Sequence, residues 1–112
     1  MRGRNGGIGQ SEYKVIPMNK KEEYAQKLQA QLDEWSAEID QLVAKADKAK
    51  ADARVHYLRE AEQIRGKEIE ARAKLEGLKG ASEAAWEDMK VGAEKARDTL
   101  SQAIQSARTR FE

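Results

Sequence analysis

Apolar residues recur at helical spacing in the stretch Tyr24–Leu42. Five of them alternate in steps of four and three: Leu28, Leu32, Trp35, Ile39 and Leu42. Because an α-helix has about 3.6 residues per turn, this spacing places the five side chains on one stripe. The residues between them are mostly charged or carry amides. The pattern therefore predicts an amphipathic helix whose apolar stripe must be covered by another helix.

The same rhythm predicts one long helix over residues 19–79. Asn19 is a favourable N-cap, and Glu22 stands where a capping box needs an acidic side chain. Beyond Leu42 the stripe is carried by alanines in AKADKAKADAR, and it then resumes at these positions: Tyr57, Ala61, Ile64, Glu68, Ala71, Leu75 and Leu78. Consecutive steps of four lead up to Tyr57. We therefore expect a coiled-coil helix that straightens or changes partner near residues 53–57.

A break is predicted near residue 80. Gly80 suits a left-handed C-cap, and Ser82 suits the N-cap of a new helix. The segment 80–112 is again amphipathic, and its apolar residues are Trp86, Met89, Ala93, Ala96, Leu100, Ile104, Ala107 and Phe111. The break is interpreted either as a kink or as the turn of a helical hairpin.

A hairpin would lay Leu100 and Ile104 against residues 57–64 and would leave Tyr24–Leu42 uncovered. Either geometry therefore predicts a contact with another chain. The sequence does not choose an oligomer number or a helix orientation, because its apolar positions lack a consistent β-branched preference.

Residues 1–18 differ in character from the rest of the chain. They contain four of the eight glycines. Pro17 keeps them from joining the helix that follows. One interpretation is an extended, flexible tail. The alternative is an arm that docks on another surface through Ile8, Tyr13, Val15 and Ile16.

Composition supports long helices and narrows the functional classes. Charged residues make up 37% of the 112 residues and aromatic residues only 5%, with a net charge of +1. Such a balanced charge gives no reason to expect a nucleic-acid partner. No cysteine is present, and no apolar run approaches the roughly 18 residues of a membrane span. The first residues lack the apolar core of a secretory signal, so a cytoplasmic protein is expected.

The chain offers little catalytic chemistry. His56 is the only histidine. The carboxylates lie on predicted helix surfaces without a pocket that would shift a pKa. We therefore expect a protein that is not an enzyme and has no catalytic, cofactor-binding or metal-ligating residues. Trp35 and Trp86 are interpreted as packing residues, with anchoring at a membrane surface as the alternative.

Two segments carry a resemblance to a known family. KLQAQLDEWSAEIDQLVAKADKAKADAR and AWEDMKVGAEKARDTL resemble small bacterial coiled-coil proteins described as stress-response proteins. The resemblance covers about residues 20–112. It implies a cytoplasmic helical protein to which no catalytic position can be transferred.

These observations predict an all-α, non-enzymatic protein that acts through helix–helix association. It would be a self-assembling scaffold or an accessory subunit of a larger complex. The predicted partner-binding residues are Leu28, Leu32, Trp35, Ile39, Leu42, Trp86, Met89, Leu100, Ile104 and Phe111. The alternative is a stress protectant that becomes ordered on membranes or client proteins.

Overall fold

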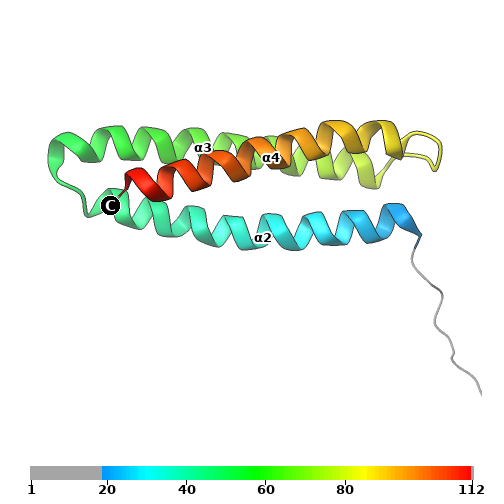
Figure 1. Cartoon of the computed structure of the whole chain (residues 1–112), viewed down its shortest axis with the longest axis horizontal. Coiled ribbons are helices and arrows are strands. Elements are labelled where there is room, and N and C mark those ends of the chain that lie inside the picture. The colour runs from blue at the N-terminus through cyan, green and yellow to red at the C-terminus, as the bar shows by residue number, and fades with distance from the viewer. Residues whose placement is uncertain (1–18, 112) are drawn as a thin grey trace, which may run out of the picture.

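Three helices, each antiparallel to the next one along the chain, form the structure, a computed structural model that describes residues 19–111 (Figure 1). They are α2 (Lys20–Asp47), α3 (Ala51–Lys79) and α4 (Trp86–Arg110). α2 and α4 run in the same direction and α3 runs against them. The prediction of an all-α fold is confirmed. The predictions for residues 1–18 lie outside the described part of the chain.

The start of α2 follows from local sequence. The Asn19 side chain accepts a hydrogen bond from the Glu22 backbone N–H at 2.8 Å. The Glu22 carboxylate accepts one from the Asn19 backbone N–H at 3.4 Å. These two bonds form the predicted capping box and satisfy backbone donors that have no partner inside the helix.

The prediction of one helix over residues 19–79 is wrong. The chain reverses between Asp47 and Ala51, and Lys50 takes an extended conformation with φ −63° and ψ 154°. Alanine and lysine favour helix here, but by only tenths of a kcal/mol per residue. Reversal lets α2 and α3 cover each other, and each large apolar side chain that becomes buried contributes about 1.5–3 kcal/mol. Tertiary burial therefore outweighs local propensity.

The second reversal lies close to the predicted break, and it is a hairpin turn rather than a kink. The Ser82 hydroxyl accepts a hydrogen bond from the Ala85 backbone N–H at 3.2 Å. The Ser82 carbonyl accepts bonds from the backbone N–H groups of Ala85 and Trp86. Ser82 therefore closes the turn that precedes α4. The N-cap of α4 is Ala85, which makes no side-chain cap bond, so the N-cap role predicted for Ser82 is wrong. Gly80 ends α3 with φ −85°, so the left-handed conformation predicted for it is wrong.

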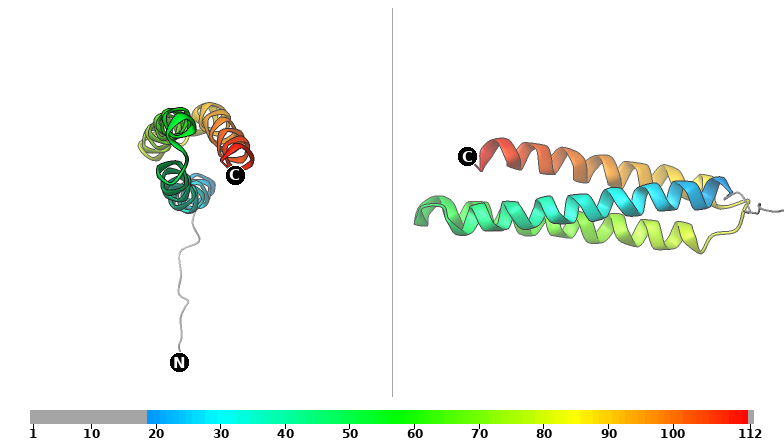
Figure 2. Two further views of the ribbon diagram at one scale, coloured as in Figure 1. Left: turned by 90° about the vertical axis from the view of Figure 1, so that its left-hand side faces the viewer. Right: turned by 90° about the horizontal axis from the view of Figure 1, so that it is seen from below.

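The three helices are grouped around a common axis, as the end-on view in Figure 2 shows, and their buried apolar residues form one core cluster. It includes the α2 stripe: Leu32 and Ile39 have no exposed surface, and Leu28 and Leu42 are each 2% exposed. The expectation that this stripe stays uncovered is therefore wrong. The missing cover comes from α3, which folds back because the chain turns at residues 48–50.

The start of α3 and the end of α4 are held together at the end of the bundle that lies away from the turn between these two helices. The rings of Tyr57 and Phe111 stack with their centroids 4.5 Å apart. Arg110 forms an ion pair with Glu60 beside them. This arrangement agrees with the hairpin alternative, but the residues opposite Tyr57 and Glu60 are Phe111 and Arg110 rather than Leu100 and Ile104. α3 packs along both other helices, whereas α2 and α4 contact each other much less.

We predict that Leu32→Asp combined with Ile39→Asp unfolds the bundle. Truncating one buried leucine costs about 2–5 kcal/mol, a buried unpaired carboxylate costs more, and small domains have only about 5–15 kcal/mol of stability. Circular dichroism should show lost helicity at every protein concentration. Ala37→Asp, on the exposed face of α2, is the control and should keep the helix signal. A double variant that stays helical would contradict the assigned core.

Candidate functional site

Most of the predicted partner-binding residues lie inside the chain's own core. The buried ones are Leu28, Leu32, Ile39, Leu42, Trp86, Leu100, Ile104 and Phe111. Trp35 is half-buried and packs against the core, while Met89 is 40% exposed. The structure thus brings nearly all of them together, but as contacts between helices of one chain. A binding surface has to be sought on the outside of the bundle.

One charged residue occupies the core stripe of α3. Glu68 is only 6% exposed and lies between two arginines of its own helix. Arg65 Nη1 donates to Glu68 Oε1 at 3.1 Å, and Arg72 Nε donates to Glu68 Oε2 at 3.0 Å. Both carboxylate oxygens are therefore satisfied. That explains how the sequence tolerates a glutamate at an apolar position.

The same arginines reach across to α2. Arg65 pairs with Asp40, and Arg72 Nη2 donates to Asp33 Oδ1 at 3.2 Å. Burial lowers the pKa of Arg65, but hydrogen bonds to Asp40 and Glu68 outweigh that effect and hold it above its ordinary value. The five side chains form one continuous network that fixes the register of α2 against α3.

An aromatic cluster lies where α2 meets the start of α4. The rings of Tyr24 and Trp86 are 6.4 Å apart, and Lys90 Nζ lies 5.2 Å from the Tyr24 ring centroid and 5.9 Å from that of Trp86. The Tyr24 hydroxyl is buried without a hydrogen-bond partner among the described residues. Burial of this hydroxyl, together with the nearby carboxylate of Glu94, raises the pKa of Tyr24.

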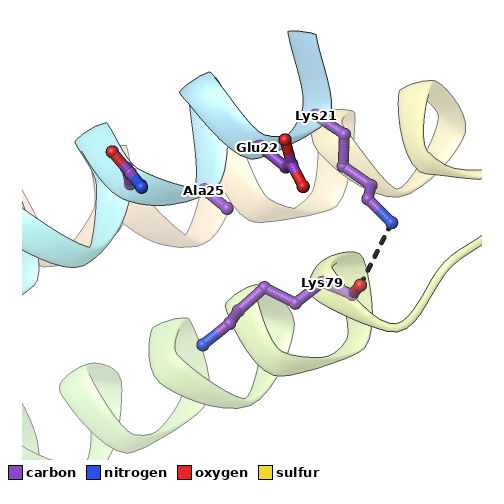
Figure 3. A pocket seen from close by; sticks show the side chains of 5 residues that line it. Lys21, Glu22, Ala25 and Lys79 are labelled. Carbon is purple, nitrogen blue, oxygen red and sulfur yellow. Dashed lines mark hydrogen bonds between the residues drawn. The ribbon is translucent and has the colours of Figure 1, made fainter. Parts of the chain in front are cut away.

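A shallow hollow lies between the start of α2 and the end of α3 (Figure 3). Lys21 Nζ donates to the backbone carbonyls of Lys79 at 3.2 Å and Ala81 at 2.9 Å. A cation at a helix C-terminus satisfies unpaired carbonyls and complements the helix dipole. Since Lys21 is occupied in this way, the hollow is best explained as part of the connection between the two helices.

Another hollow surface runs along the α3–α4 pair. Two adjoining hollows of about 300 and 450 Å³ share Lys67 and Thr99 in their linings. The α4 side of this α3–α4 groove is lined by five small residues, Gly92, Ala96, Thr99, Ala103 and Ser106, together with Lys95, Gln102 and Arg110. Nothing lies within 4 Å of the position that a Cβ on Gly92 would occupy. The groove is thus open where it passes over Gly92.

The groove residues were missed when the sequence was read for large apolar side chains. The signal was nevertheless present, because positions 92, 96, 99, 103 and 106 repeat in steps of four and three. That is the spacing of a helix stripe. Small residues along a stripe leave depressions into which side chains of a packed helix can insert. Of the five, only Ala96 belonged to the predicted apolar stripe of the C-terminal segment.

The described residues present few groups for cofactor chemistry. Within residues 19–111, no three His, Cys, Asp or Glu side chains lie together in a way that could hold a metal ion. His56 is exposed on α3. None of the described helices combines the length and apolar character that crossing a bilayer requires.

Comparison of the chain with family models, with curated proteins and with solved structures gave no match. The resemblance to bacterial stress-response coiled-coil proteins therefore stays a prediction. The protectant and membrane-surface interpretations also stay predictions. A function is therefore inferred from the surface of the bundle.

We predict that Glu68→Ala lowers the free energy of unfolding by about 1–3 kcal/mol, because hydrogen bonds to a charged group contribute about that much. The variant leaves Arg65 and Arg72 without their shared acceptor. Chemical denaturation monitored by circular dichroism measures the change. Glu62→Ala, at an exposed position of the same helix, should stay within about 0.5 kcal/mol of wild type. Equal effects of the two substitutions would refute a structural role for the network.

We predict that Tyr24→Phe is as stable as wild type or more stable by up to about 1 kcal/mol at neutral pH, because it removes a buried hydroxyl without a partner. At alkaline pH the difference should grow. The unfolded chain releases the tyrosine proton near the ordinary pKa of 10.0, whereas the folded chain retains it above that pH. Wild-type stability therefore falls as pH rises above 10.

Urea denaturation of wild type and Tyr24→Phe at several alkaline pH values measures this difference. Tyr57→Phe, which changes the tyrosine stacked on Phe111, is the matched control. If the stability difference between wild type and Tyr24→Phe does not change with pH, the explanation of the raised pKa by burial is wrong.

Proposed function

We propose that this chain is a non-enzymatic helix-binding protein, which serves as an accessory subunit or scaffold of a larger assembly. The observation that carries the proposal is the α3–α4 groove. Its lining of small side chains from Gly92 to Ser106 extends over about four turns of α4. A surface of this shape suits a fourth helix, as in four-helix bundles.

The proposed binding surface, the α3–α4 groove, is not the stripe of large apolar residues that the sequence predicted. Most of the large apolar residues already cover one another within the bundle, so a partner does not have to complete the core. The exposed ones, Val55, Ile69, Met89 and Val91, do not line the groove. Instead, the partner would add its own apolar side chains to a preformed depression. A preformed surface loses little conformational entropy on binding, and this favours recognition by a rigid module.

Glycine at position 92 allows the groove to be filled without a clash in the fold. Since nothing lies within 4 Å of its missing Cβ, Gly92→Leu can place a large side chain in the groove. Gly66 on α3 has the same open surroundings but does not line the groove. Gly66→Leu is therefore a matched control. Both changes should keep or raise thermal stability, because leucine favours helix by about 0.8 kcal/mol over glycine.

We predict that Gly92→Leu abolishes binding at the α3–α4 groove and that Gly66→Leu does not. Because the chain has no cysteine, Thr99→Cys provides a single thiol in the groove for a benzophenone cross-linker. Gln41→Cys places the same probe on the exposed face of α2. In extracts of the source organism, the Thr99 probe should cross-link one defined helical segment. That product should disappear with Gly92→Leu and persist with Gly66→Leu.

Mass spectrometry of the cross-linked peptide separates the two forms of the proposal. A segment of the same chain means self-assembly, which sedimentation should then also report. A segment of another protein means an accessory subunit. Equal cross-linking from Thr99 and Gln41, or a product that Gly92→Leu leaves unchanged, would overturn the proposed function.

A further inference from the structure

The flanks of the α3–α4 groove are rich in lysine. Lys67 and Lys74 stand on the α3 side, and Lys95 stands on the α4 side. None of these three lysines forms an ion pair with another residue in the described range 19–111. Arg110, by contrast, is neutralised by Glu60 at the end of the groove. With the carboxylate of Glu70, which lines the same part of the groove, counted against these three lysines, the lining keeps an excess of positive charge.

The positions of these lysines follow the geometry of a docked helix. Lys67 and Lys74 are seven residues apart, which is about two turns, so they point from the same face of α3. The pair Glu60–Arg110 sets the antiparallel register of α3 and α4. Fourteen residues from this pair along each helix lie Lys74 and Ala96, so Lys74 and Lys95 flank the groove at nearly the same level. The cations thus stand on both sides of the small-residue floor.

From this arrangement we propose that the α3–α4 groove binds an amphipathic helix whose apolar stripe is flanked by acidic residues. The large apolar side chains of that helix would enter the depressions over Gly92, Thr99 and Ser106. Its carboxylates would meet Lys67, Lys74 and Lys95. This inference rests on the proposed function, and it adds the charge and the pattern of the partner. Opposite charges beside an apolar stripe select partners in the same way at the flanking positions of coiled coils.

An acidic helix fits the groove better than a phosphate-bearing surface does. Acidic side chains also line the groove, with Glu70 lying between Lys67 and Lys74 in the sequence. A phosphate track would be repelled at such a point, whereas a helix can place a cationic or neutral residue opposite it. The continuous floor of small residues has no role in binding phosphates. It is the feature that a packed helix requires.

Two synthetic peptides test the proposal. Each has four heptads with leucine at the a and d positions, and they differ only in having glutamate or lysine at all e and g positions. Repulsion between like charges keeps each peptide from pairing with itself. Fluorescence anisotropy should show that the wild-type chain binds the glutamate peptide at least about tenfold more tightly than the lysine peptide at low salt. Added salt should reduce this preference.

Charge reversal at Lys67, Lys74 and Lys95, each to Glu, should invert the preference between the two peptides. Replacing the same three residues with Gln should abolish the preference while circular dichroism stays unchanged. Gly92→Leu should weaken binding of both peptides, and Gly66→Leu should bind as wild type does.

The outcomes separate the inference from the proposed function. If Gly92→Leu weakens binding but the wild-type chain prefers the lysine peptide or neither, the groove binds helices and the inferred charge pattern is wrong. If neither peptide binds, or binding ignores Gly92→Leu, both are overturned. Vesicles of anionic phospholipid are the further comparison. Binding to them that depends on the three lysines but not on Gly92 would assign the lysines to a lipid surface and overturn the inference.

Discussion

The whole structure depends on the need to cover the apolar stripe of each helix. An isolated helix of 25–29 residues is marginal in water, since its stripe stays exposed and ordering it costs conformational entropy. In this chain α3 resolves the problem for both neighbours by packing along each of them. The two chain reversals bring α2 and α4 alongside α3 and so allow this packing. The first reversal interrupts residues that would otherwise favour a continuous helix.

Polar groups then decide which of several similar packings is adopted. Apolar stripes rich in leucine and alanine can slide past one another by a turn with little change in buried area. The network centred on Glu68 opposes such slippage, because its arginines pair with Asp40 and Asp33 of α2 in the observed register and a shift by one turn would separate these pairs. Lys21 acts similarly at the other end by donating to the last carbonyls of α3.

The proposed binding surface follows from where the large and the small apolar residues lie. Most large apolar residues are buried inside the bundle, and the strip of α4 that lines the groove carries mainly small ones, although Met89 and Val91 of the same helix are exposed. A row of small side chains on one helix buries little surface by itself. It forms a groove only when a neighbouring helix supplies the opposite wall. Lys67 and Lys74 belong to that wall. They lie across the groove from Gly92 and Lys95 because α3 and α4 pack side by side in antiparallel orientation.

Local features were readable from the sequence because short-range hydrogen bonds decide them. The capping of α2 by Asn19 and the turn that Ser82 closes before α4 each depend on residues three positions away. The helical character and the identity of the core residues were readable for the same reason, since periodicity is a local property. The turn at residues 48–50 was not, because Lys48, Ala49 and Lys50 carry no strong turn signal.

The sequence by itself thus determined the helical character, the apolar faces and the start of the first helix. Only the tertiary structure decided that these faces cover one another within one chain. The physical reason is that the free energy of burial depends on which surfaces meet. A stripe such as Leu28–Leu42 specifies that it must be covered, but it does not specify by which helix. Once α3 and α4 are in place, the groove between them is decided as well.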